Sequence, residues 1–238
     1  MKSVFKLMLL TVAVLLLMAP AIRAQHLQAS LNFLLGQPQN EFQDNVEDLG
    51  FGLGGNFGYH FGNSPIMVGA EIQYMIYGSQ TRNVPFSETI PDVTVEVETS
   101  NNILLFHALA RLQSPTGRFR PYLDGLWGLN YFFTETSVRD EDAFEEEIAS
   151  STNQQDAAFS YGAGGGVMLQ VYQSRKPETG GVKLSEVLID FRVRYLFGGE
   201  ATYLKEGSIT VENGQVAIAA LRSRTDLLTY QLGVSFSF

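Results

Sequence analysis

Apolar and polar residues alternate along the last segment of the chain. One set of alternate positions is large and apolar: Leu228, Tyr230, Leu232, Val234, Phe236 and Phe238. The positions between them are small or polar: Thr229, Gln231, Gly233, Ser235 and Ser237. Because successive side chains of a β-strand point to opposite sides, this alternation predicts a strand with one apolar and one polar face.

The same period of two recurs in seven segments upstream. They lie at about residues 27–35, 51–61, 68–76, 104–112, 123–133, 159–171 and 187–197. Long polar connections over residues 36–48, 80–98, 135–156 and 200–226 alternate with short ones at 62–65, 114–119 and about 173–185. The pattern predicts an all-β fold, an eight-stranded antiparallel up-and-down β-barrel that spans a membrane and carries its long loops at one end.

The first 24 residues have the composition of a targeting segment. Lys2 and Lys6 precede an apolar run over residues 7–18. Residues 22–24 form a cleavage signal close to A-x-A, with residues 19–21 as an alternative site. The apolar core is about 12 residues long, whereas a spanning helix needs about 20. We expect a cleaved signal peptide over residues 1–24 and a barrel over residues 25–238, with an uncleaved signal anchor as the alternative.

The composition excludes several classes of protein. The chain has no cysteine, so it has no disulfide, thiolate metal site or lipidated cysteine. Its net charge is −9, and removal of the three basic residues of the predicted signal leaves −12. Nucleic-acid binding needs a basic surface, so we expect no nucleic-acid partner.

Alternation alone does not decide which face of the barrel points outward. A soluble barrel of the lipocalin type turns its apolar face inward, and this is the alternative to a membrane barrel. The polar face is rich in glycine and serine, which suit a narrow lumen. The apolar face carries aromatic residues near strand ends, as membrane interfaces require: Tyr59, Phe61, Tyr131, Phe133, Tyr195 and Phe197. Both features favour a barrel that faces lipid.

The end of the chain resembles the C-terminal assembly signal of bacterial outer-membrane proteins. The resemblance rests on Gln231, Gly233, Phe236 and Phe238. The whole mature chain is similar to small barrels of the OmpA/OmpX type in strand count and loop asymmetry. This resemblance implies export through the inner membrane and a location in the bacterial outer membrane. It also implies two partners, the outer-membrane lipid and, during biogenesis, the barrel-assembly machinery.

Six ionisable residues lie on the polar face: Glu71, Arg111, Asp124, Asp190, Arg192 and Arg194. Charges inside a narrow barrel must pair, because burial of a single charge is costly. We expect a lumen charge network with a structural role. A gated ion path is the alternative, although eight strands leave room for little more than side chains.

No motif predicts catalysis or a bound cofactor. A G-x-S-x-G motif is absent, and no serine, histidine and carboxylate set clearly shares one membrane level, although His60 and His107 lie on the polar face. The glycine-rich residues 162–166 lack the lysine of a phosphate-binding loop. We therefore expect no catalytic residue, no cofactor and no metal ligand. A lipid-modifying outer-membrane enzyme is the alternative.

The long loops concentrate the negative charge. By these boundaries they hold 20 of the 25 acidic residues, most densely at Asp140, Glu141, Asp142, Glu145, Glu146 and Glu147. The loops have no EF-hand spacing. They form either a solvated surface or a site for divalent cations or an extracellular partner. We expect a non-enzymatic structural or surface-interaction role, with a small channel as the first alternative.

Overall fold

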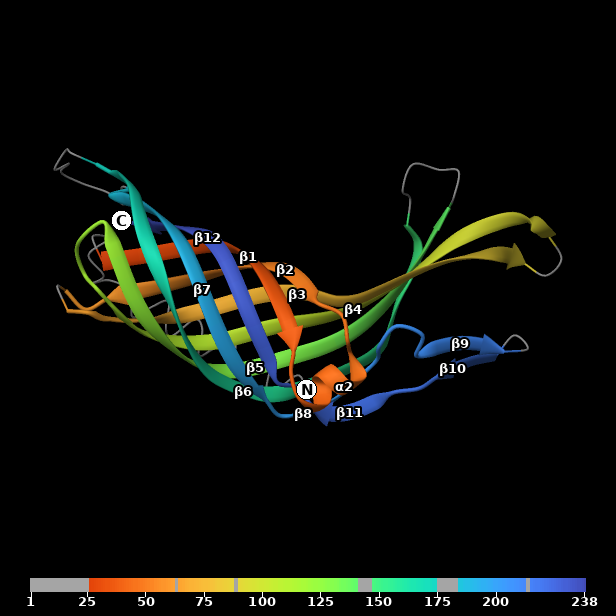
Figure 1. Cartoon of the computed structure of the whole chain (residues 1–238). Coiled ribbons are helices and arrows are strands. Elements are labelled where there is room, and N and C mark those ends of the chain that lie inside the picture. Colours follow the sequence, from red (N-terminus) through yellow and green to blue (C-terminus); the bar gives the residue numbers. More distant parts are fainter. Residues whose placement is uncertain (1–25, 63, 88–89, 141–146, 175–183, 213–214) are drawn as a thin grey trace, which may run out of the picture.

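A closed antiparallel barrel forms the body of the molecule. The computed structural model describes residues 26–238 except 63, 88–89, 141–146, 175–183 and 213–214. The barrel strands are β1 (Leu27–Pro38), β2 (Gly50–His60), β3 (Ile66–Ser87), β4 (Ile90–Gln113), β5 (Phe119–Asp140), β6 (Glu147–Gln173), β7 (Glu186–Gly198) and β12 (Leu227–Ser237). The predicted eight-stranded barrel is confirmed (Figure 1). The predicted signal peptide, residues 1–24, lies outside the described residues and stays a prediction.

The last strand closes the barrel against the first. The pairing of β12 with β1 runs from Gln28 opposite Ser237 to Pro38 opposite Leu227 without a register shift. The N–H of Phe238 then donates to the carbonyl oxygen of Leu27 at 2.9 Å. Closure leaves the backbone groups of the wall paired, which a barrel in hydrocarbon requires.

Four strands continue far beyond the barrel wall. β2 stops pairing with β3 at Ile76, and β7 stops pairing with β6 at Ser160. The pairing of β3 with β4, β4 with β5 and β5 with β6 goes on for many residues, so these strands form an open sheet that projects from one end (Figure 1). We call this sheet the extension.

The extension corrects the prediction of long loops over residues 80–98 and 135–156. Most of these residues lie in strands instead. Register shifts occur where the strands leave the barrel, at Ile76/Gly78 in the pairing with β4 and at Thr134/Glu135 in the pairing with β6. Such bulges bend and twist a strand.

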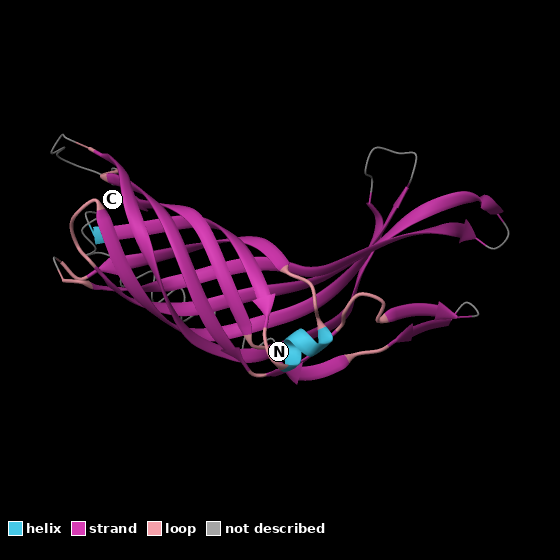
Figure 2. Ribbon diagram, viewed as in Figure 1, coloured by secondary structure: helices cyan, strands magenta, loops and turns pink. Residues whose placement is uncertain are grey.

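Short elements cover the same end of the barrel. They are α2 (Glu41–Asn45), β8 (Glu200–Tyr203), β9 (Ile209–Glu212), β10 (Gln215–Ile218) and β11 (Leu221–Arg224). α2 and the β8–β11 pair lie at the barrel mouth, while the β9–β10 hairpin projects away from it (Figure 2). Among the described residues, no helix is long and apolar enough to cross a membrane.

Candidate functional site: the filled lumen

The lumen contains all six charged residues that the sequence places there. Glu71 lies on β3, Arg111 on β4 and Asp124 on β5, and each is at most 4 % exposed. β7 supplies the other three at alternate positions, Asp190, Arg192 and Arg194, which are equally buried. The alternation of β7 turns all three inward. Three carboxylates therefore face three guanidinium groups inside the barrel.

Arg194 joins two of the carboxylates. Its Nη1 donates to Glu71 Oε1 at 2.7 Å, and its Nη2 donates to Asp124 Oδ2 at 2.5 Å. Arg111 binds the same aspartate with two nitrogens, Nε at 2.7 Å and Nη2 at 3.0 Å. Such two-pronged contacts between guanidinium and carboxylate are among the strong hydrogen bonds of proteins.

Arg192 joins the third carboxylate to this group. It pairs with Asp190, and its Nη1 lies 3.5 Å from Glu71 Oε2. Its Nη2 also donates to Asn32 Oδ1 at 3.1 Å. The hydroxyl of Tyr122 donates to Asp190 Oδ1 at 2.6 Å, and the same ring lies 3.9 Å from the guanidinium carbon of Arg111. The six charged groups and Tyr122 form one connected lumen charge network.

The network is electrically balanced. A buried ion costs several kcal/mol unless a partner of opposite charge and good geometry compensates it. Each of the three carboxylates here contacts at least one guanidinium group. The geometry is therefore that of a neutral polar filling. A structural role for the network, or a role in gating an ion path, stays a prediction.

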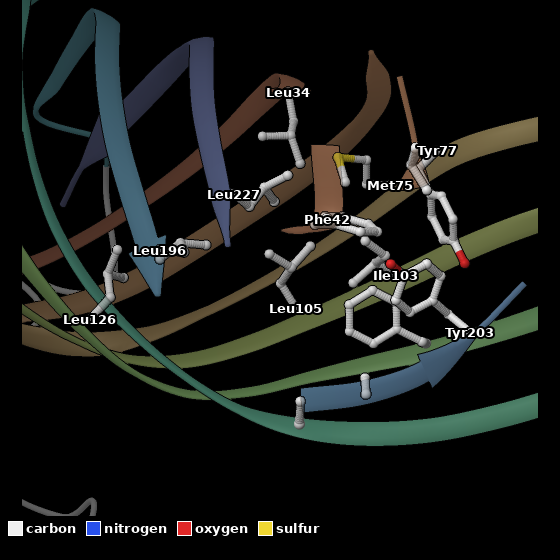
Figure 3. Packing of buried hydrophobic residues seen from close by; sticks show 14 of the residues in the cluster. Leu34, Phe42, Met75, Tyr77, Ile103, Leu105, Leu126, Leu196, Tyr203 and Leu227 are labelled. Atoms are coloured by element: carbon white, nitrogen blue, oxygen red, sulfur yellow. The ribbon is translucent and has the colours of Figure 1, made fainter. Parts of the chain in front are cut away.

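An apolar cluster closes the lumen between the network and the end with the extension. We call it the apolar plug, and Figure 3 shows its packing. Its members include Leu34, Phe42, Met75, Tyr77, Ile103, Leu105, Phe132, Leu196, Tyr203 and Leu227. Phe42 of α2 is fully buried at its centre, with ring centroids 5.1 Å from Tyr203, 5.7 Å from Tyr77 and 5.9 Å from Phe132.

Hydrogen bonds hold α2 over the plug. Asn40, which precedes the helix with a φ of 52°, donates from Nδ2 to Asp226 Oδ2 at 2.8 Å. Asn45 Nδ2 donates to the hydroxyl of Tyr203 at 3.0 Å. The N–H of Arg224 donates to Glu41 Oε2 at 3.0 Å. The first and last connections at this end are thus tied together across the barrel mouth.

Sequence reasoning missed the plug, although a signal for it exists. The alternation breaks where apolar residues follow one another, as in residues 103–106 (Ile-Leu-Leu-Phe) and 131–133 (Tyr-Phe-Phe). In such runs one parity faces outward, and the other, including Leu105 and Phe132, is buried in the plug. In this chain, these runs of consecutive apolar residues mark strand segments that contribute to the plug.

One histidine does meet a serine, but deep in the lumen. His107 Nε2 lies 3.1 Å from Ser160 Oγ, and both residues are fully buried. His107 Nδ1 has no hydrogen-bond partner in the part of the chain that the structure describes. The nearby Glu71 is bound by Arg194. The pair therefore lacks both an orienting carboxylate and an open approach for a substrate, which nucleophilic catalysis requires.

The acidic connections show no metal site within the described residues. No group of three or more potential ligands comes together there. The densest predicted acidic run includes residues 141–146, which lie outside the described residues. Binding of divalent cations by that run stays a prediction.

The residues of the predicted assembly signal have distinct positions on β12. Gln231 and Gly233 face the lumen, and a Cβ atom at Gly233 would collide with Asn32. Because Asn32 receives a hydrogen bond from Arg192, the glycine leaves room for the charge network. Phe236 is paired with Ala29, and Phe238 lies at the barrel end with the short turns (Figure 1). Recognition of these residues during assembly stays a prediction.

The outward face of the barrel is apolar and widely exposed. Leu31, Leu53, Leu123 and Trp127 are each 65–69 % exposed. Aromatic side chains pack against one another on this face, for example Tyr195 and Phe197 with centroids 4.8 Å apart. Water-soluble proteins rarely expose large apolar surfaces, whereas membrane barrels present such a band to lipid. The polar face is thus the inner one, which excludes the lipocalin-like alternative.

Comparison with known proteins identifies the class of this barrel. A family model described as the outer membrane protein beta-barrel domain matches residues 9–238. The match confirms the predicted resemblance and supports an outer-membrane location, while the route of export stays a prediction. No curated protein matches the sequence.

Solved structures with similar folds are small outer-membrane barrels. Neisserial surface protein A is 13 % identical, with 89 % of this chain and 97 % of that chain covered and a TM-score of 0.43. Ail of Yersinia pestis, solved with the heparin analogue sucrose octasulfate, is 12 % identical, with 90 % and 98 % covered and a TM-score of 0.36. The N-terminal barrel of Pseudomonas aeruginosa OprF is 12 % identical, with 89 % and 97 % covered and a TM-score of 0.32.

Substitution of Arg194 tests the energetic role of the network. Arg194→Met removes the cation that bridges Glu71 and Asp124, so we expect the free energy of unfolding to fall by about 3–5 kcal/mol. The double variant Glu71→Gln, Arg194→Met restores neutrality and is expected to recover part of that loss. Urea unfolding in lipid vesicles measures both. Wild-type stability of the single variant would contradict a pairing role.

Deletion of Phe238 tests the assembly signal separately from stability. We expect less folded barrel in the outer membrane of cells, because the assembly machinery no longer reads the chain end. Refolding of the purified variant into detergent should stay close to wild type, since Phe238 donates only one of the backbone hydrogen bonds between the first and last segments. Equal losses in cells and in detergent would show a purely structural role.

Proposed function

This chain belongs to the outer membrane protein beta-barrel family, and on that premise we propose that it is a non-enzymatic barrel that binds a surface partner through its extension. Long connections of such barrels face the outside of the cell and short turns face the periplasm. The observation that carries the proposal is the extension itself, an open four-stranded sheet outside the barrel wall.

The edges of the extension support a role in binding. Near the barrel rim they are covered: Ser79 N–H donates to Glu206 Oε1 at 2.8 Å, and Thr202 N–H donates to Asp156 Oδ2 at 2.7 Å. Farther out, no described strand pairs with the outer edge of β3 over residues 78–87 or of β6 over residues 147–157. An edge of this kind offers N–H and C=O groups to an extended segment of another chain.

The charge of the extension favours a basic partner. Its strands carry more acidic than basic residues: Asp92, Glu96, Glu98, Glu135, Asp140 and Glu147, against Arg82 and Arg139. At its base, hydrogen bonds from the backbone N–H groups of Thr202 and Ala157 hold the pKa of Asp156 below its ordinary value. Charges of one sign speed the encounter with a partner of the opposite sign, and this effect weakens as salt screens it.

The lumen weighs against the two alternative functions. The lumen charge network and the apolar plug occupy the space that a small channel would need for conduction. The His107–Ser160 pair is buried and lacks an orienting carboxylate, which argues against a lipid-modifying enzyme of the serine hydrolase type. Binding outside the membrane leaves this interior undisturbed.

Truncation of the extension tests the proposal. In one variant, residues 81–98 and 135–153 are each replaced by Asn-Gly, because Gln80 faces Thr99 and Thr134 faces Gln154 in register and Asn-Gly forms a two-residue hairpin turn. We expect normal insertion, because the barrel wall is untouched. Adhesion of expressing cells to a polylysine-coated surface should fall to background, and wild-type adhesion should weaken as salt is raised.

The β9–β10 hairpin provides a matched control. Ala219 N–H donates to the carbonyl oxygen of Ser208 at 2.8 Å, so residues 209–218 can also be replaced by Asn-Gly. This deletion removes an outward hairpin and leaves the extension intact, and adhesion should persist. Undiminished adhesion of the truncated barrel, with surface display equal to wild type, would refute a binding role for the extension.

A further inference from the structure

A groove crosses the outward face of the barrel over β6, β7, β12 and β1. Its volume is about 540 Å³. Its lining on the outward face is entirely apolar or aromatic apart from the hydroxyl of Tyr230, with Phe33, Leu35, Val167, Phe191, Val193, Tyr230 and Leu232. The groove is part of the lipid-facing band and is separate from the lumen and the extension.

Strand register explains the shape of the groove. Gly165, Val193, Tyr230 and Leu35 are opposite one another in successive strand pairs and form one row across the wall. Two residues along each strand, Val167, Phe191, Leu232 and Phe33 form the next row. The side chains of the two rows are the walls, and the backbone between them is the floor.

Glycine and inward-pointing residues keep the floor low. Gly165 lies at an outward position but adds no side chain there. The floor residues Arg192 and Gln231 turn their side chains into the lumen, where they are 2 % and 5 % exposed. The hydrogen-bonded strands hold the walls apart, so the groove does not close by itself. An unfilled space of this kind forfeits dispersion contacts, and a flexible partner of hydrocarbon chemistry restores them.

We propose that this groove is a binding site for one acyl chain of a lipid in the outward-facing leaflet. Hydrocarbon already surrounds this face, so the preference comes from packing rather than from the hydrophobic effect. A chain in the groove contacts the floor and both walls, whereas a chain on the convex wall contacts one surface. Leu35 lies near the outer end of β1 and Tyr230 near the outer end of β12, which places the groove toward the outer leaflet.

The site takes a hydrocarbon chain, and the Tyr230 hydroxyl is the one polar side-chain group in its outward lining. A protruding side chain from a second copy of this barrel is the competing occupant, because a small residue such as Gly165 also allows close packing between membrane proteins. The proposal rests on the barrel and its register, and it is independent of the proposed function.

Photocrosslinking with a defined lipid tests the site. The full mature barrel is placed in nanodiscs of phosphatidylcholine that include a trace of phosphatidylcholine with a diazirine in the middle of one acyl chain. Mass spectrometry then locates the adducts. We expect several-fold more label on Phe191, Val193 and Tyr230 than on Leu53 and Ile72, which are outward residues at least as exposed but outside the groove.

Two matched variants decide whether the groove causes this preference. Val193→Phe places a ring in the groove, and the label on Phe191 and Tyr230 should fall to the level of Leu53 and Ile72. Val68→Phe makes the same change at a similarly exposed outward position outside the groove, and the labelling should stay as in wild type. Gel mobility before and after heating verifies that both variants are folded.

Three results would overturn the proposal. They are even labelling over the outward face of the wild type, unchanged groove labelling in folded Val193→Phe, and less label on the groove residues than on Leu53 and Ile72 in the wild type. The last result would assign the groove to a second copy. Concentrated labelling that only Val193→Phe removes would establish the acyl-chain site.

Discussion

Charge balance in the lumen is the constraint on which the rest of the structure depends. Three guanidinium groups and three carboxylates share a space filled with side chains, where each ion alone would be strongly unfavourable. They come from four strands, so their pairing links opposite walls of the barrel that are far apart in sequence. Arg194 is central, because it contacts carboxylates from β3 and β5 while it lies on β7. Even the glycine of the last strand serves this arrangement, since a side chain at Gly233 would displace Asn32 from Arg192.

The lumen, the outward face and the extension of this barrel differ in composition and in surroundings. The lumen charge network and the apolar plug fill the barrel, and α2 covers the extension end of the lumen with Phe42. The outward face meets lipid with apolar side chains. Beyond the membrane, the extension presents paired strands with open edges and acidic side chains. A filled barrel is a suitable base for the binding role that we propose for the extension, because binding there does not require any change in the lumen.

The period of two predicted the strands and the six lumen charges, because one strand parity faces lipid and the other faces the lumen along the whole wall. The same rule could not predict the plug. Leu105 and Phe132 face inward, but their neighbours in the sequence are outward apolar residues. Both faces of these strand segments are therefore apolar, and the alternation disappears. It also did not assign the extension to strands, because the polar, proline-containing residues there favoured loops, even though Val93, Val95 and Val97 alternate with Thr94, Glu96 and Glu98. The partner of each charged residue depends on the register between neighbouring strands. The alternation in a single sequence does not determine that register.

The most direct test of the sealed lumen is electrical recording of the purified barrel in a planar lipid bilayer. Conduction through the barrel would require ions to pass both Phe42 and the Arg194 pairs. Because the lumen is filled, we expect the inserted protein to give no discrete current steps at any voltage that the bilayer withstands. Reproducible unitary steps from the folded wild-type barrel, absent in protein-free bilayers, would show an open path and would contradict a sealed interior.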